Sequence, residues 1–172
     1  GQINAYEISR LIAQKGHTVD IITRNNGKDN LKSPKNLRVY KLGDYKKPYD
    51  AISKILFLID SFKFIYKKDY DIVHAHAFLP GITAMLLGFF KHTPTVFGVH
   101  GTSIGRNLNS PLKSFLEKLI LTKIHYTAQI TVSRDFQKLK NINRKIFYVS
   151  NGVNIEAFEK VKAAKFNNPT LI

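Results

Sequence analysis

The chain has 172 residues, a hydrophobic share of 44% and no cysteine. This length fits one domain with a full core, the apolar content excludes a disordered chain, and the lack of cysteine excludes disulfides, thiolate chemistry and cysteine-based metal sites. Lys and Arg number 27 against 12 Asp and Glu, a net charge of +15. Such a surface attracts polyanions such as nucleic acid, an anionic membrane or phosphorylated small molecules, or lysine merely solvates it.

The predicted elements alternate along the chain. Periodicity predicts helices over residues 4–15, 49–68, 79–91, 111–125 and 133–140, and strands over 18–23, 37–42, 71–76, 95–99, 129–132 and 146–149. Gly16 is a natural helix stop, Pro111 suits the first turn of its helix, and Ser133 is placed as an N-cap. The order predicts an α/β fold, a Rossmann-like and mostly parallel sheet with helices on both faces.

A sheet of this kind normally opens with a strand, and the turn after that strand is where phosphates bind. Here the first predicted element is a helix, and the sequence begins at Gly1 without a Met. We therefore expect that a first strand is missing from this sequence. No apolar run approaches the roughly 18 residues that a membrane span requires.

Two of the predicted strands end in histidine. His74 and His76 lie two residues apart, so their side chains share one face, and His100 directly follows the next strand. Ligands of open parallel sheets bind outside the carboxyl ends of the strands, which makes these imidazoles candidates for an active-site wall. His74 and His76 could bind a metal or a substrate, or His74 could be a half-buried histidine with satisfied hydrogen bonds. Zinc needs at least a third protein ligand, so we predict no metal.

His100 is the most attractive single residue, because Gly101 and Thr102 after it leave room for a ligand near the backbone. Its imidazole could donate a hydrogen bond to a sugar hydroxyl or a phosphate, act as an acid or base, or merely terminate the strand. Arg106 in the following loop could bind phosphate or stay solvated. Ser133 could add an anion site to its default role as a helix cap.

The predicted helix over residues 49–68 carries both lysines and aromatic residues. A helix of this composition can lie on an anionic bilayer. We favour the ordinary alternative, a helix packed on the sheet with a basic outer face, because any surface helix is amphipathic.

Four segments together resemble the amino-terminal domain of GT-B glycosyltransferases, in particular the retaining family 4 or group 1 type. They are DIVHAHAFLPGITAMLL at 71–87, PTVFGVHGTS at 94–103, ITVS at 130–133 and VSNGVNIEAF at 149–158. Each segment is a weak signal alone, but their order and spacing are fairly specific, and they span nearly the whole chain.

The resemblance implies one half of a two-domain enzyme that transfers a sugar, of hexosyl type, from a nucleotide-diphosphate sugar to a hydroxyl acceptor. Residues 1–150 would form the acceptor-binding domain, and 151–172 the hinge and the start of a donor-binding domain that this sequence lacks. The fragment alone would be inactive. The acceptor could be lipid-linked or a glycan, in polysaccharide or glycolipid biosynthesis, and no cofactor is implied. The expected location is cytoplasmic, at the inner membrane face, with an anionic membrane surface as a further partner.

The resemblance also assigns roles to single residues. His100 corresponds to the histidine near the sugar and the reaction centre, His76 to the second histidine of the first motif, and Ser133 to a serine near the acceptor pocket. Gly1, with Gln2, corresponds to the end of the glycine-rich loop that approaches the donor phosphates. Three positions depart from the family pattern: Gly98 where Thr is common, Gln129 where Asp is frequent, and Asn154 in place of Asp.

Two other functions stay open at this point. A basic module for nucleic acid would explain the charge, but no RNP-type motif, zinc finger or helix-turn-helix signature is visible, so nucleic acid is disfavoured. Another GT-B enzyme, such as a nucleotide-sugar epimerase, would share the fold, since a fold does not determine a function.

Overall fold

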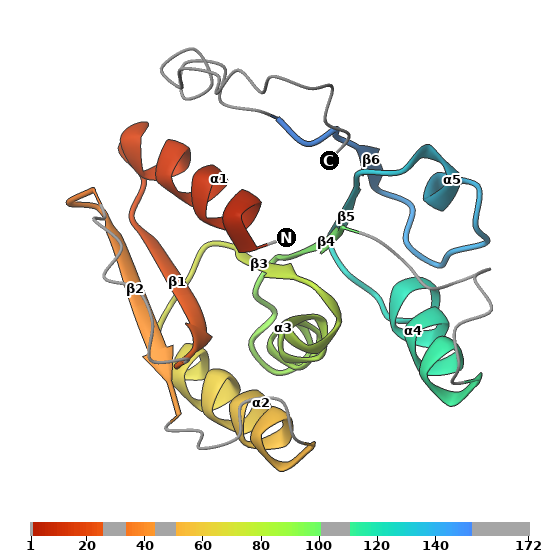
Figure 1. Cartoon of the computed structure of the whole chain (residues 1–172), viewed down its shortest axis with the longest axis horizontal. Helices are drawn as coiled ribbons and strands as arrows, with labels where there is room; N and C mark the ends of the chain where they lie inside the picture. Colours follow the sequence, from red (N-terminus) through yellow and green to blue (C-terminus); the bar gives the residue numbers. More distant parts are fainter. Residues whose placement is uncertain (1, 26–33, 44–50, 101–110, 153–172) are drawn as a thin grey trace, which may run out of the picture.

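The computed structural model describes residues 2–25, 34–43, 51–100 and 111–152. The elements in chain order are α1 (Gln2–Gln14), β1 (Val19–Arg24), β2 (Leu37–Leu42), α2 (Ala51–Tyr66), β3 (Val73–His76), α3 (Phe78–Lys91), β4 (Thr95–Val99), α4 (Pro111–Lys123), β5 (Ala128–Thr131), α5 (Arg134–Gln137) and β6 (Ile146–Tyr148). Every element expected from the sequence is present, and the α/β class with parallel strands flanked by helices is confirmed (Figure 1).

The strands of the described residues form two sheets where the alternation predicted one. β1 pairs with β2, and β3, β4, β5 and β6 pair in that order, with every ladder parallel. Among the described residues no ladder joins β1 to β3. A cavity of about 120 Å³ lies between them, lined by Asp20 and Ile22 of β1, by His74 and Ala75 of β3, and by side chains of α2 and α3.

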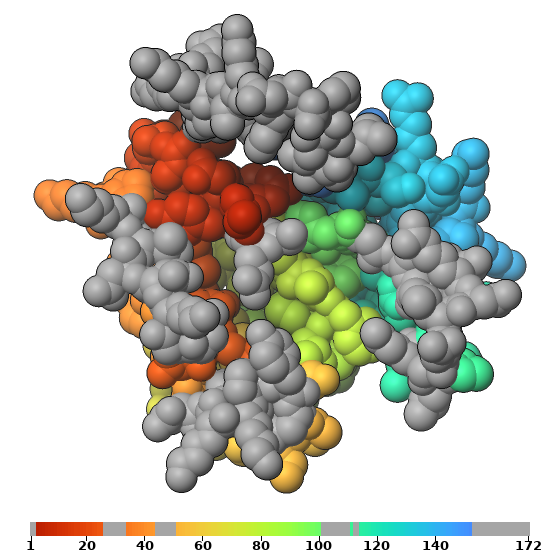
Figure 2. All heavy atoms as spheres, in the orientation of Figure 1, coloured from red at the N-terminus to blue at the C-terminus, as the bar shows by residue number. Residues whose placement is uncertain are grey.

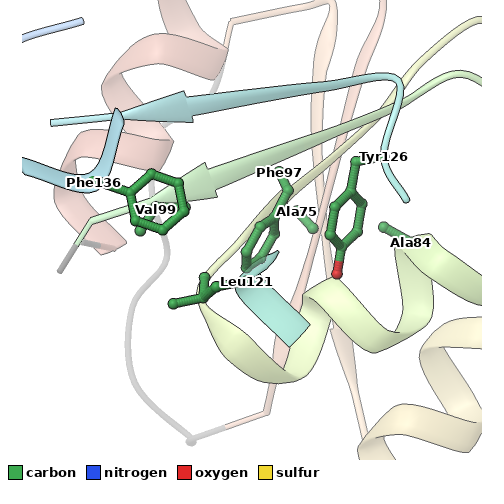
Figure 3. Packing of buried hydrophobic residues seen from close by; sticks show 7 residues of the cluster. All are labelled: Ala75, Ala84, Phe97, Val99, Leu121, Tyr126 and Phe136. Atoms are coloured by element: carbon green, nitrogen blue, oxygen red, sulfur yellow. The ribbon is translucent and has the colours of Figure 1, made fainter. Parts of the chain in front are cut away.

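The core lies where α3 and α4 pack on the four-stranded sheet. It contains Ala75, Ala84, Phe97, Val99, Leu121, Tyr126 and Phe136 (Figure 3). The rings of Phe97 and Tyr126 stack with centroids 4.8 Å apart, and the Tyr126 hydroxyl donates to the carbonyl of Gly81 at 3.2 Å. Gly81 permits this approach of α3, since a Cβ there would stand 2.7 Å from a Phe97 ring carbon.

A buried amide network fills the end of the sheet beyond the core. Gln129, fully buried, donates to the Leu121 carbonyl at 2.8 Å and accepts from Asn141 at 2.7 Å. Asn143 in turn accepts from the Tyr126 backbone N–H at 2.7 Å. The departure at Gln129 is therefore accommodated by neutral hydrogen bonds rather than by an ion pair.

Two elements differ from their predicted form. α5 has only four residues, where the sequence predicted a helix to about Lys140, because Asn141 and Asn143 use their side chains to bond backbone groups in place of helical pairing. The outer face of α2 is apolar, where a basic face was favoured: Ile52 and Ile55 are exposed, whereas Ser53 and Ser61 are buried.

Candidate functional site

Three imidazoles form a row on one face of the four-stranded sheet. His74 and His76 come from β3, and His100 directly follows β4, which is the neighbour of β3 in the sheet. Ring centroids are 4.0 Å apart between His74 and His76, and 5.0 Å apart between His76 and His100. His76 Nδ1 and His100 Nε2 lie 2.7 Å apart, within hydrogen-bond distance. The prediction that histidines from separate segments converge at one rim is confirmed.

Gly98 provides the room for this row. It pairs with His76 across the β3–β4 ladder, so a side chain there would share a face with the imidazoles. A Cβ on Gly98 would lie 3.2 Å from His74 Nε2 and 3.4 Å from His76 Nδ1. The glycine that stands here, where the resemblance led us to expect Thr, thus leaves this space to the two rings.

The backbone turns sharply at the end of the row. Ala77, directly after His76, has a φ of 76°, in the region that favours glycine. Its N–H donates to the Gly98 carbonyl at 3.5 Å, and its carbonyl accepts from the Gly81 N–H at 3.3 Å. The strained turn is therefore held by β4 and α3, and it fixes where His76 leaves the strand.

The row is neutral at physiological pH. Burial lowers the pKa of His74 to about 4, with a further contribution from His100. Burial, and then the neighbouring imidazoles, lower the pKa of His76 to about 3, and burial also lowers the pKa of His100. A neutral imidazole has one donor and one acceptor nitrogen. The His76–His100 bond consequently couples the two tautomers, because the nitrogen that donates in it determines what each ring offers a ligand.

His74 departs from the expectation of a satisfied side chain. It is half-buried, as expected, but its buried Nε2 atom has no hydrogen-bond partner. A buried polar atom without a partner costs free energy, about 1–3 kcal/mol for an ordinary group. His74, the imidazole of the row that lines the cavity between the sheets, therefore has a nitrogen that could form a hydrogen bond with a ligand.

Ser133 was expected to cap a helix and could add an anion site, and the structure shows the cap. Its Oγ accepts from the Asp135 N–H at 3.3 Å, which confirms the N-cap. The role of Ser133 as a ligand contact stays a prediction, to which a helix of a single turn adds no argument. Arg134, beside it, lies over the ring of Tyr148 at 5.1 Å.

Several predicted positions lie outside the described residues. They are Gly1, Gly101, Thr102, Arg106 and Asn154. Gln2 is described only as the first residue of α1. A contact that the sequence did not predict holds the start of α1: the Asn4 side-chain amide donates to the side-chain oxygen of Asn151 at 2.5 Å. Asn151 was interpreted only as part of a hinge, and nothing in the sequence marked Asn4 as its partner.

A second polar cluster, also missed, surrounds Asp20. Its carboxylate is almost fully buried and receives Arg38 at 2.7 Å, Lys68 at 3.1 Å and the Tyr70 hydroxyl at 2.8 Å. Burial by itself would raise the pKa of Asp20, but the hydrogen bonds from Tyr70, Lys68 and Arg38 hold it below its usual value. This cluster joins β1 to β2 through Arg38 and to the segment after α2 through Lys68 and Tyr70.

Within residues 2–25, 34–43, 51–100 and 111–152, no group of three or more His, Asp or Glu side chains is arranged to hold a metal ion. Over the same ranges, none of the helices has the length and apolar character that a bilayer crossing requires.

A family model described as Glycosyltransferase Family 4 matches residues 2–157. No individual curated protein matches the chain.

Proposed function

The chain belongs to glycosyltransferase family 4, and from this premise we propose that it is the acceptor-side domain of a retaining glycosyltransferase. The complete enzyme would move a sugar, of hexosyl type, from a nucleotide-diphosphate sugar to a hydroxyl group of a glycan or a lipid-linked acceptor. Residues 1–150 would form this domain, and residues 151–172 would lead into a donor-binding domain. Activity would then require that second domain.

The observation that carries the proposal is the contact between His76 and His100. It brings imidazoles from two strands to the carboxyl end of the sheet, where parallel α/β folds bind their ligands. In our proposal His100 is the catalytic residue, and its Nδ1 is the atom that meets a sugar hydroxyl near the reaction centre. Positive groups of the donor side would stabilise the departing diphosphate.

His76 has a distinct role in this proposal. It lies between His74 and His100, and its Nδ1 bonds the Nε2 of His100. It would therefore act as a positioning residue, which sets the ring orientation and tautomer of His100. Ser133, Gly101, Thr102 and Arg106 remain proposed substrate contacts, and Gly1 with Gln2 a proposed approach to the donor phosphates.

The test is turnover of the complete enzyme with its donor and acceptor. We expect His100→Ala to lower kcat by more than about tenfold, since loss of one hydrogen bond to the reacting groups costs at least about 1.4 kcal/mol. His125→Ala is the matched control, because His125 is an exposed histidine away from the row. A His100→Ala enzyme with unchanged kcat removes His100 from the catalytic site.

The positioning role of His76 has its own readout. We expect His76→Phe to keep the ring and lower kcat while shifting the acid limb of the pH–rate profile, because His100 loses its imidazole partner. His76→Asn, which keeps a hydrogen-bonding side chain, should restore part of the activity. An unchanged pH–rate profile in His76→Phe would contradict this role.

A further inference from the structure

α2 is apolar on both of its faces. Its inward face buries Phe57 and Ile65 together with Ser53 and Ser61. Its outward face carries the α2 stripe, Ile52, Ile55, Leu56 and Ile59, with exposed fractions of 69, 57, 45 and 44%. These residues recur at i, i+3, i+4 and i+7, which places them on one side of the helix. A helix that is apolar all round is normally covered on every side.

The stripe continues into aromatic residues at the end of α3. Phe62 of α2 contacts the ring of Phe90 with centroids 6.2 Å apart and that of Tyr66 at 5.4 Å, and Phe89 contacts Phe90 at 5.0 Å. Phe89 and Phe90 are 73 and 57% exposed. We call Phe62, Tyr66, Phe89 and Phe90 the aromatic corner. Helices α2 and α3 adjoin each other (Figure 1). The exposed side chains of the α2 stripe and the aromatic corner are the apolar surface of this helix pair.

Lysines border this surface. Lys63 follows the stripe on the same side of α2, and Lys67 lies just beyond the helix, and both are exposed. Lys91, at the end of α3, is engaged with Asp69 at 2.9 Å and with backbone carbonyls. Asp60 is the acidic residue of α2. An apolar stripe with basic residues beside it is the pattern of a helix that lies in the headgroup region of a membrane.

We propose that the α2 stripe and the aromatic corner dock on an anionic lipid bilayer. The apolar side chains would enter the boundary between headgroups and acyl chains, and the bordering lysines would attract anionic headgroups. Charge argues against a second copy of the chain as the occupant, because two molecules of net charge +15 repel one another. α2 has 16 residues, so it would lie along the membrane rather than cross it.

This surface is separate from the imidazole row. α2 lies at the margin of the molecule, whereas β3 and β4 lie at its centre (Figures 1 and 2). Docking would therefore leave the histidines accessible to a substrate. It would hold the domain at a membrane whatever the acceptor is, so it can be tested apart from the catalytic proposal.

The experiment is co-sedimentation of the full-length protein with vesicles. One set contains phosphatidylcholine alone, and the other equal parts of phosphatidylcholine and phosphatidylglycerol. We expect binding to the mixed vesicles that weakens as salt rises. Ile55→Asp combined with Ile59→Asp should weaken this binding by at least about tenfold. Both side chains are exposed, so circular dichroism and the melting temperature should match the unsubstituted protein.

Two matched controls make the test specific. Ile142→Asp with Phe147→Asp introduces the same charges at side chains of similar exposure, 45 and 53%, away from α2. It should bind like the unsubstituted protein. Lys63→Glu with Lys67→Glu should lose binding to the mixed vesicles, whereas Lys140→Glu with Lys145→Glu, an equal change in net charge at exposed positions elsewhere, should lose much less.

Three results would overturn the inference. The first is no binding of the unsubstituted protein to either kind of vesicle. The second is equal loss in the Ile55/Ile59 and Ile142/Phe147 variants. The third is a dimer of the unsubstituted protein in solution that becomes a monomer in the Ile55/Ile59 variant, which would make the surface an interface between copies. Sugar transfer to a soluble acceptor reports on the catalytic proposal separately, since it does not require a membrane.

Discussion

Asp20 and His74 line the same cavity from different sheets, but they differ in charge and in the hydrogen bonds that their polar atoms make. Asp20 keeps its charge, because three donors surround its carboxylate. His74 loses its charge on burial and leaves Nε2 without a partner. A fully satisfied charge is typical of a cluster that holds elements together, and an incompletely satisfied neutral group is typical of a site that receives a ligand.

At neutral pH, the largest effect on stability expected from this comparison is at Asp20. Asp20→Asn should lower the free energy of unfolding by about 2 kcal/mol, because charge-assisted hydrogen bonds from Arg38, Lys68 and Tyr70 are weakened together. Urea denaturation at neutral pH measures the change. Asp69→Asn is the control, since its carboxylate is fully exposed and its pair with Lys91 should contribute little. Equal effects of the two substitutions would refute the structural role of the Asp20 cluster.

The imidazole row and the Asp20 cluster should also lose their contributions to the free energy of unfolding in different ranges of pH. The pKa values of His74 and His76 are lowered in the folded chain, so the unfolded chain binds their protons first as the pH falls below about 6.5. Stability is then lost on acidification toward about pH 4, with a slope of up to about 1.4 kcal/mol per pH unit for each imidazole. Asp20, whose pKa is lowered from 3.8, stays ionised over this range, and its contribution is lost only at lower pH.

Urea denaturation at a series of pH values tests this order. His74→Asn should flatten the slope between pH 6.5 and 4, because it removes one of the titrating groups. Asp20→Asn should leave that slope unchanged and reduce only the loss at lower pH. A stability that is constant down to pH 4 in the unsubstituted protein would mean that the imidazoles are not held neutral.

A smaller effect is expected at Gly98. Gly98→Ala places a Cβ 3.2 Å from His74 Nε2, so the imidazole row must shift. We expect a loss of about 1 kcal/mol in stability together with lower turnover and altered histidine titration by NMR. Gly152→Ala is the control, since nothing lies near a Cβ there. Turnover equal to that of the unsubstituted enzyme would show that the spacing of the rings is not required.

The sequence predicted the elements and the convergence of His76 with His100 well. Histidines at strand ends are visible in the sequence, and parallel pairing brings consecutive strand ends together, so the contact of His76 with His100 followed from local patterns. Gly16, with a φ of 97°, and Pro111 also end and begin their helices as predicted.

Other features depended on contacts between distant residues. Asp20 meets Tyr70 across 50 positions, and Gln129 bonds Leu121 and Asn141 through the fold, and no spacing rule encodes such pairs. The apolar outer face of α2 was missed for a related reason. Periodicity shows that a helix has an apolar side, but it does not show whether that side faces the protein or the solvent. In α2 the side that faces the protein includes two buried serines, and the more apolar side is exposed.

The division into two sheets has a consequence for how the molecule opens. Hydrogen-bond ladders join the four strands from β3 through β6. In the part of the chain that is described, β1 and β2 are connected to these four strands through helix packing and the Asp20 cluster. Such a link permits partial unfolding in separate cooperative units. Amide hydrogens of Ile21 and Ile22 should therefore exchange with deuterium as one early group, and those of Phe97 and Val99 in the central strand should be the last to be replaced.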